Sequence, residues 1–188
     1  MIKKLILSLG IFITLSFGAT IIDWVIAYEK GDFKTAFPIF EDLASKGNAT
    51  AQYVLGIMYE NGEGVKQDYI KAKEWYTKSA NKGLAEAQYN LGGIYFNGKG
   101  VKQDYRQAIY WYKKAANQKH AQAQHNVGVM YANGYGAKQD YKIAKIYFGQ
   151  ACDGGHQLGC DAYKEVNQLG YWYGIDYFKM DYTLYYRY

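Results

Sequence analysis

The chain has 188 residues, a formal net charge of +5 and a single proline. This mild charge comes without a dense run of Lys or Arg, so nothing provides the basic surface that nucleic acid or an anionic membrane requires, and we expect neither partner. One proline in the whole chain favours long helices over a loop-rich β-sandwich.

Residues 1–18 have the pattern of a secretory signal peptide. Two lysines precede an apolar run over 5–17, and Ser16 and Gly18 place small residues at the −3 and −1 positions of a cleavage site. An uncleaved N-terminal anchor is the alternative, although the run is short for crossing about 30 Å of hydrocarbon. We therefore expect a periplasmic or secreted bacterial protein that keeps no stable membrane span after the segment is removed.

One polar phrase occurs three times at intervals of 36 residues. It reads NGEGVKQDY from Asn61, NGKGVKQDY from Asn97 and NGYGAKQDY from Asn133. Full copies of a 36-residue repeat therefore occupy 49–84, 85–120 and 121–156. Asp32 and Asp176 continue the series of aspartates at the same interval. We therefore predict degenerate copies at 19–48 and 157–188.

Each copy predicts two helices joined by the repeated phrase. In the first full copy, apolar residues recur at helical spacing over about 49–60 and again over about 69–80. Gly62 is expected to close the first helix in the left-handed conformation, and Asp68 to cap the second. The repeated phrase is thus interpreted as the turn between two helices rather than as a ligand-binding loop. The predicted fold class is all-α, an α/α solenoid of about five helix pairs.

A glycine occupies the interior of each first helix, where it costs about 0.5–1 kcal/mol relative to alanine. Close approach of a neighbouring helix is the expected compensation. Three alanines of the second helices are the predicted small partners. The glycines are Gly56, Gly92 and Gly128, and the alanines are Ala72, Ala108 and Ala144.

The two ends are predicted to differ from the middle of the array, as end repeats do. A short leading helix is expected over about 21–30, followed by a second helix that holds Pro38 and is therefore expected to kink. The last copy is rich in aromatic residues. We expect these to cap the array, with an exposed sticky face as the alternative.

The string A-x-A-Q-Y-x-L-G-x-M-Y-x-N-G-x-G-V-x-Q-D-Y-x-x-A-x-x-W-Y at 49–76 resembles the Sel-1-like repeat. The resemblance is strong over 49–156 and weaker over 21–48 and 157–188. It implies a tetratricopeptide-like superhelix whose concave face, lined by the first helices, binds other proteins.

The segment CDGGHQLGC at 152–160 is similar to the bridging element of a cysteine-rich secreted branch of this family. That resemblance implies a disulfide between Cys152 and Cys160, and an even cysteine count in an oxidising compartment agrees with it. Zinc held by the two cysteines with His156 is one alternative, and free thiols are another. We expect no metal and no cofactor.

Proteins of the cysteine-rich branch have been called β-lactamases or penicillin binders, so weak β-lactam binding or turnover is the alternative function. Ser79 and Lys82 match the Ser-x-x-Lys pattern of serine β-lactamases. However, the next copy places Ala115 and Gln118 in the same two slots, and no further motif of that chemistry follows. No histidine pair shares a helical face, and His125 replaces tyrosine as a packing residue. No catalytic residue is assigned.

The slots that vary most between copies fall three or four residues apart on the first helix, so they share one side of it. Repeated slots must pack against similar neighbours, whereas variable ones are free to face solvent or a partner. We predict a monomeric protein-interaction scaffold that binds another protein through this first-helix stripe. Its residues are Thr50, Val54, Ile57, Glu60, Glu86, Asn90, Phe96, Gln122, Asn126 and Val129.

Overall fold

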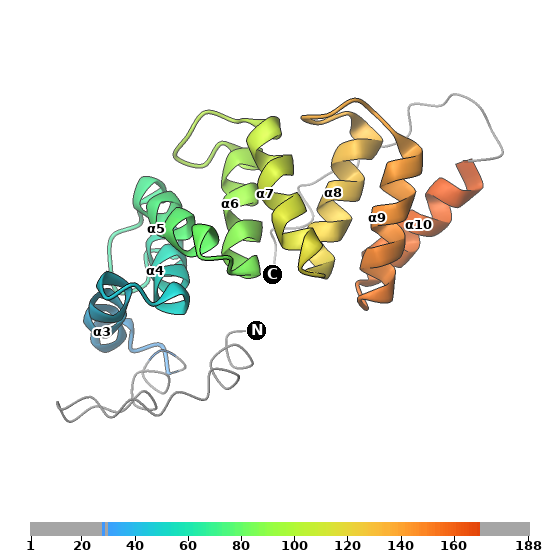
Figure 1. The fold of residues 1–188 in the computed structure, drawn as a ribbon. Helices are drawn as coiled ribbons and strands as arrows, with labels where there is room; N and C mark the ends of the chain where they lie inside the picture. Colours follow the sequence, from blue (N-terminus) through green and yellow to red (C-terminus); the bar gives the residue numbers. More distant parts are fainter. Residues whose placement is uncertain (1–27, 29, 170–188) are drawn as a thin grey trace. The chain divides into compact units, whose positions relative to one another are not determined.

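The computed structural model describes residues 28 and 30–169. The signal-peptide pattern, most of the predicted leading helix, Asp176 and the aromatic C-terminal segment lie outside these residues. Eight helices and no strand are found in the described part of the chain (Figure 1). The predicted all-α class is therefore confirmed for that part.

Each of these helices has thirteen residues, and most of them follow the predicted repeat. Three pairs, α4–α5, α6–α7 and α8–α9, fall in the three full copies, while α3 and α10 fall in the degenerate ones. The helices are α3 (Phe33–Ser45), α4 (Ala49–Asn61), α5 (Tyr69–Asn81), α6 (Ala85–Asn97), α7 (Tyr105–Asn117), α8 (Ala121–Asn133), α9 (Tyr141–Asp153) and α10 (Gln157–Leu169). Helix α3 runs through Pro38 without ending there.

The aspartate of the repeated phrase caps each second helix, as predicted. Oδ1 of Asp68 accepts hydrogen bonds from the backbone N–H groups of Ile70 and Lys71, both at 3.0 Å. Asp104 and Asp140 cap α7 and α9 in the same way. These bonds satisfy amide groups that have no partner within the helix.

The first helix of each copy ends as the sequence predicts, with an additional brace that the sequence did not reveal. Gly62 has φ +76°, and its N–H donates to the carbonyl of Met58. Nε2 of Gln67 donates to the carbonyl of Glu60 at 2.8 Å. Gln103 and Gln139 repeat this bond to the carbonyls of Phe96 and Ala132, both at 2.7 Å. The glutamine of the phrase therefore closes the loop onto the helix end.

The second glycine of the phrase brings two consecutive repeats together. A Cβ at Gly136 would collide with the carbonyl of Tyr105, at the start of the preceding second helix. Gly64 stands in the same relation to the carbonyl of Phe33. Both glycines also have positive φ, so the loop can rest on the neighbouring backbone only without a side chain.

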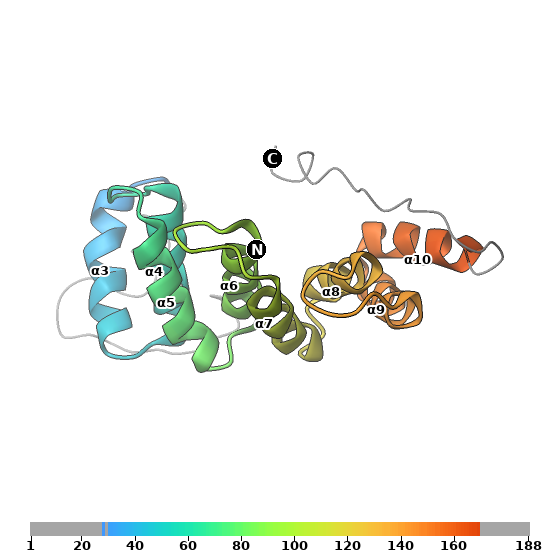
Figure 2. The same cartoon turned by 90° about the horizontal axis from the view of Figure 1, so that it is seen from above.

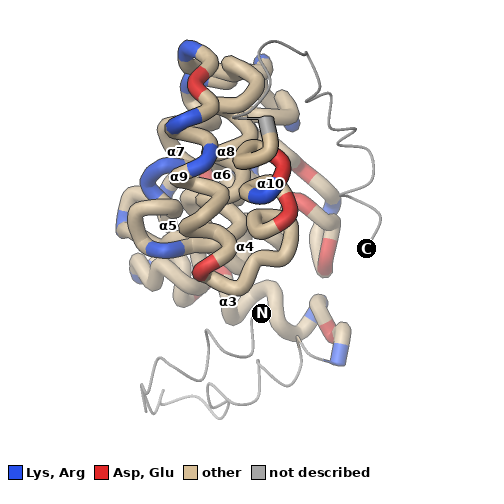
Figure 3. Tube along the Cα trace, turned by 90° about the vertical axis from the view of Figure 1, so that its right-hand side faces the viewer, with Lys and Arg blue, Asp and Glu red and all other residues tan. Residues whose placement is uncertain are grey.

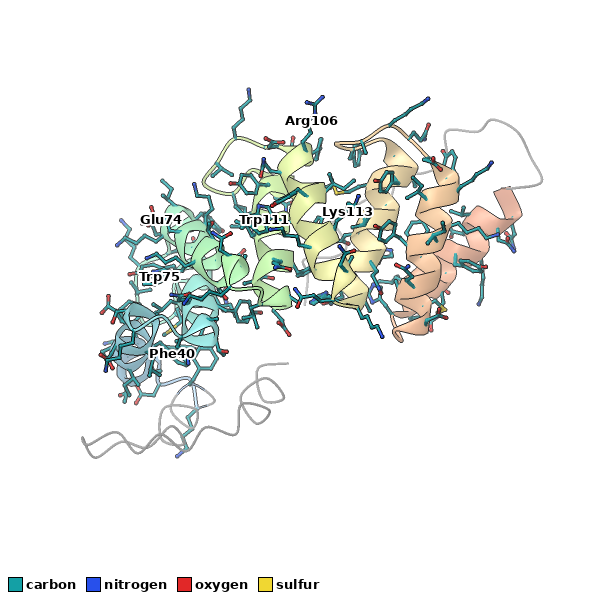
Figure 4. The ribbon with its side chains drawn as sticks, in the orientation of Figure 1. Phe40, Glu74, Trp75, Arg106, Trp111 and Lys113 are labelled. Atoms are coloured by element: carbon teal, nitrogen blue, oxygen red, sulfur yellow. A yellow bond between two sulfur atoms is a disulfide. The ribbon has the colours of Figure 1, made fainter. Side chains whose placement is uncertain are left out.

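The chain forms two compact units, Met1–Ala87 and Gln88–Tyr188. In the first unit, α3, α4 and α5 lie side by side in both ribbon views (Figures 1 and 2). Phe40 of α3 is 1% exposed and packs with Leu55 and Met58 of α4, which are fully buried (Figure 4). Tyr76 of α5 is also fully buried.

The second unit has two apolar clusters. One joins α7 and α8 through Tyr112, Val127 and Met130. The other is built on Phe148 of α9, together with residues of α8 and Val166 of α10. Helices α8, α9 and α10 accordingly lie side by side (Figures 1 and 2).

Candidate binding site

The first-helix stripe does not lie on the surface as a whole. Val54 is 1% exposed and belongs to the core between α3 and α4. Val129 is also 1% exposed, because α10 packs against α8 and covers it with Ala162 and Val166. The expectation that these two residues are open to a partner is therefore wrong. The same slots are half-buried in the other full copies, at Asn90 and Asn126 for Val54 and at Ile57 and Gly93 for Val129.

Two further residues of the stripe are engaged within the chain. The Phe96 ring lies 5.3 Å from the Tyr105 ring and 6.1 Å from the Tyr135 ring, between centroids. Oε2 of Glu60 accepts a hydrogen bond from the hydroxyl of Tyr76 at 2.8 Å. Phe96 was expected to be exposed, whereas its aromatic neighbours leave it half-buried.

The other six residues of the stripe are half-buried and lie on three first helices. On α8, Gln122 and Asn126 are one helical turn apart. Oδ1 of Asn126 lies 3.4 Å from Nδ1 of the preceding residue, His125. The remaining four are Thr50 and Ile57 on α4 and Glu86 and Asn90 on α6.

His125 is a packing residue in the slot that tyrosine holds in the other copies. Its ring centroid lies 5.5 Å from that of Phe148, and the equivalent Tyr89–Tyr112 distance is 5.6 Å. Burial lowers the pKa of His125 to about 4, and the nearby His156, 5.1 Å away between ring centroids, acts in the same direction. His125 is thus neutral at neutral pH. Burial lowers the pKa of His156 as well.

Aromatic rings are the nearest groups to the interior glycines of the first helices, and at Gly128 the backbone carbonyl of the predicted partner Ala144 follows at 3.2 Å from an added Cβ. A Cβ at Gly128 would lie 2.6 Å from Cδ1 of Phe148, and one at Gly92 would lie 2.6 Å from Cδ1 of Tyr112. Tyr76 is equally close to Gly56. Close approach of a neighbouring helix is confirmed, but the ring of the second helix is the group that needs the space. The sequence shows this aromatic residue in every full copy, twenty positions after the glycine of the first helix.

Cys152 and Cys160 form a disulfide, with their Cα atoms 4.5 Å apart. In the earlier copies this position carries a hydrogen bond: Nε2 of Gln124 donates to the carbonyl of Ala116, and Gln52 donates to that of Ala44. The cysteines occupy the same two slots as these partners. The bridge therefore replaces a repeated turn-to-helix contact with a covalent one. Among the described residues, no group of three or more His, Cys, Asp or Glu side chains is arranged to hold a metal ion.

The Ser-x-x-Lys match is part of the packing between turns. Ser79 is fully buried, and its hydroxyl donates to the carbonyl of Ala49 at 2.8 Å. Nζ of Lys82 donates to the carbonyl of Gly47 at 2.7 Å. Both side chains thus tie α5 and its turn to the start of α4, and no observation favours the alternative of β-lactam chemistry.

Charged side chains of both signs are scattered over the described part of the chain (Figure 3). Helix α10, for example, carries Asp161, Lys164 and Glu165. Several lysines lie over aromatic rings instead of gathering in one basic patch. Nζ of Lys78 is 3.8 Å from the Trp75 ring centroid, and Nζ of Lys114 is 4.8 Å from that of Trp111. In the described part of the chain, no helix is both long and apolar enough to cross a membrane.

These features define a protein of the helix-turn-helix repeat class, in which capped, glycine-closed helix pairs recur every 36 residues. The Sel1 repeat family model matches residues 49–84, 85–120 and 121–156. The chain belongs to the Sel1 repeat family. A search of the curated proteins finds no match.

Solved structures of bacterial repeat proteins share the fold. A Sel1 repeat protein from Oxalobacter formigenes is 30% identical with a TM-score of 0.72, and the match covers 79% of this chain and 60% of that one. A protective antigen of uropathogenic Escherichia coli strains with an SLR fold is 40% identical with a TM-score of 0.70, covering 78% of this chain and 31% of that one. This chain thus spans less than two thirds of both.

The cysteine-rich protein B of Helicobacter pylori is also similar in fold. It is 24% identical with a TM-score of 0.56, and the match covers 69% of this chain and 93% of that one. This likeness concerns the fold.

Proposed function

We propose that this chain is an interaction module that binds another protein through the half-buried residues of the first-helix stripe that lie in the second unit. Asn90 of α6 and Gln122 and Asn126 of α8, all in the second unit, form the centre of the proposed site. The carrying observation is that the two slots vary among the three full copies, as Thr50, Glu86 and Gln122 and as Val54, Asn90 and Asn126, while the residues around them repeat and pack. Membership of the Sel1 repeat family supports a binding role, since such repeats commonly serve as interaction scaffolds.

The chemistry of the proposed site is that of an amide-rich surface. Asn and Gln side chains both donate and accept hydrogen bonds, so they suit the backbone of a partner segment without requiring a particular charge. The apolar core directly beneath them holds α8 rigid, with Val127 and Met130 at most 1% exposed. A rigid helix presents these amides with little loss of conformational entropy on binding.

Site-specific photo-crosslinking tests this proposal. Benzoylphenylalanine would replace Asn126 in the full chain, produced in the bacterium that carries it. We expect irradiation to give a discrete protein adduct, because the side chain at this position would lie within the interface. Mass spectrometry of the adduct identifies the partner.

A matched position separates a specific site from general surface contact. Lys142 is exposed on α9, and the same substitution there should give no discrete adduct. The proposal is overturned if the two positions crosslink equally or if Asn126 gives no adduct. Substituting Asn90 by Arg should reduce the Asn126 adduct, since a long charged side chain would obstruct the same surface.

We also propose that the chain is exported. The signal-peptide pattern at 1–18 and the Cys152–Cys160 disulfide both support this, because structural disulfides persist mainly outside the cytoplasm. Intact mass of the protein recovered from the envelope or medium is the test. Loss of about the first eighteen residues is expected, and a full-length chain confined to the cytoplasm would rule export out.

A further inference from the structure

A pocket of about 610 Å³ lies where the C-terminal ends of α7 and α9 meet the beginning of α8. None of the first-helix stripe residues lines it. The lining residues used below are Asn117, Lys119, Gln124, Gln150, Asp153 and Gly154. The proposal made for it goes beyond the proposed function and does not depend on it.

Gln124 brings a buried acceptor to this pocket. Its side chain is 6% exposed, and Nε2 donates to the carbonyl of Ala116 at 3.3 Å. This bond fixes which end of the amide is the oxygen. Oε1 is buried and has no hydrogen-bond partner in the part of the chain that the structure describes. Leaving a buried acceptor without a partner is unfavourable, because it loses its hydrogen bonds to water and gains none in return.

In the preceding repeat, the equivalent acceptor has a hydrogen-bond partner. Gln88 holds the slot of Gln124, and its Oε1 accepts a hydrogen bond from Nε2 of Gln118 at 2.8 Å. The slot of Gln118 is occupied by Gly154 in the next copy. The third copy therefore lacks the amide group that would donate to Gln124, and it has a pocket at that place. In the first copy the slot holds Lys82, which donates instead to the Gly47 carbonyl.

The electrostatics of the pocket favour a cationic donor. Helices α7 and α9 both end here, and a helix C-terminus carries a partial negative charge. The carboxylate of Asp153 adds a full negative charge. Lys119 is the one cation among the lining residues and opposes this preference.

We propose that the pocket binds a guanidinium group. This group is planar like the Gln118 carboxamide, and it presents N–H donors in its plane. One N–H would donate to Oε1 of Gln124, replacing the absent amide, while the positive charge is balanced by Asp153 and the two helix ends. The guanidinium can come from a small molecule or from an arginine side chain of a partner protein.

Isothermal titration of the full, disulfide-bonded chain with two guanidinium probes tests the proposal. The probes are agmatine and the capped peptide acetyl-Gly-Arg-Gly-amide, with the capped citrulline peptide as a neutral control of the same shape. Guanidinium binding is expected, with the citrulline peptide at least about tenfold weaker because the charge is missing. Peptide binding about tenfold tighter than agmatine identifies a partner's arginine as the source, and the reverse order identifies a small molecule.

Two substitutions make the test specific. Gly154→Gln supplies the missing amide and should weaken guanidinium binding at least about tenfold, but its Cβ would lie 2.9 Å from that of Ala121. Asp153→Asn is therefore included, since Asp153 is exposed and the change keeps the shape. Lys119→Ala should strengthen binding, and Lys138→Gln, in an exposed loop, should leave it unchanged.

The proposal is overturned if neither guanidinium probe binds. It is equally overturned if Gly154→Gln and Asp153→Asn both leave the affinity unchanged, or if glutarate binds more tightly than agmatine. Photo-crosslinking at Asn126 is a separate readout, so failure here leaves the proposed partner-binding stripe standing.

Discussion

Gly92 and Tyr112 fit together only because Gly92 has no side chain. A Cβ at this position would lie 2.6 Å from Cδ1 and 2.8 Å from Cε1 of the ring. The same contact recurs between Gly128 and Phe148 in the next copy. One glycine and one ring therefore set the distance between the two helices of each pair.

The adjacent glycine provides a matched test of this contact. Gly92→Ala should lower the free energy of unfolding by about 1–2 kcal/mol, because the clash with the buried ring exceeds the gain in helix propensity. A Cβ at Gly93 would lie 3.6 Å from the Tyr112 hydroxyl oxygen, an ordinary contact, so Gly93→Ala should raise it by about 0.5–1 kcal/mol. Chemical denaturation measures both. Equal stabilisation by the two substitutions would contradict the account.

Removing the disulfide should destabilise the chain, and the repeat pattern predicts a partial rescue. Replacing both cysteines by alanine should cost about 2–3 kcal/mol of unfolding free energy. Replacing Cys152 by Ala and Cys160 by Gln restores the residue pair that forms the Gln124–Ala116 bond in the previous copy. This variant should recover about 1 kcal/mol of the lost unfolding free energy, the usual contribution of one hydrogen bond.

Intact mass with and without reductant is the control for the bridge. A gain of two hydrogens on reduction is expected from the bonded pair. No change in mass would show that the thiols are free, and equal stability of the two double variants would show that the Gln slot contributes nothing.

Stability should fall as the pH drops from about 6.5 to about 4. The pKa of folded His125 is about 4 because the ring is buried, while the unfolded residue titrates near 6.5. Between pH 6.5 and 4, His125 therefore binds a proton in the unfolded chain but not in the folded one. The free energy of unfolding falls by roughly 3 kcal/mol across this window. Burial of His156 adds to the loss in the same direction.

His125→Tyr separates this effect from the titration of carboxylates. Tyrosine holds the same slot at 53 and 89, so the variant should fold and should show a shallower loss between pH 6.5 and 4. Denaturation curves at several pH values measure the difference. An identical pH dependence of the variant and the wild type would exclude His125 as the cause.

Asp140 should be worth about 1 kcal/mol as the cap of α9. Its Oδ1 accepts from the N–H groups of Lys142 and Ile143 at 2.9 and 3.0 Å, and alanine offers no acceptor. Asn can still accept, so Asp140→Asn should cost less than Asp140→Ala. Glu165→Ala, at an exposed position of α10, should change stability by less than about 0.5 kcal/mol. Thermal melts that rank Asn and Ala alike would argue against the cap.

The helix bounds could be predicted closely because their signals are local. Asp68 caps and Gly62 closes through bonds to residues within a few positions, so the residue types alone specify them. The brace from Gln67 to the Glu60 carbonyl is also local, and its recurrence at 103 and 139 was the available signal. The aromatic ring was missed as the main neighbour of each glycine because the alanine and the ring of the second helix repeat with equal regularity, and spacing alone cannot distinguish them.

The binding stripe could be predicted only in part, because exposure depends on neighbours outside the repeat. Val54, Asn90 and Asn126 share one slot, yet Val54 is covered and the two asparagines are half-buried. The guanidinium pocket was not foreseen at all. Its signal was present in the sequence as Gly154 in the slot of Gln118, but its meaning required the Gln118–Gln88 hydrogen bond to be seen.

The sequence by itself determined the period, the caps, the turns and the class of protein, since these depend on backbone chemistry that each copy repeats within 36 residues. Only the tertiary structure decided which variable side chains are buried, which ring each helical glycine accommodates, and where a buried acceptor beside a pocket is left without a partner. Those outcomes depend on contacts between helices, and such contacts change from copy to copy, or at a single substituted slot, while the local pattern stays the same.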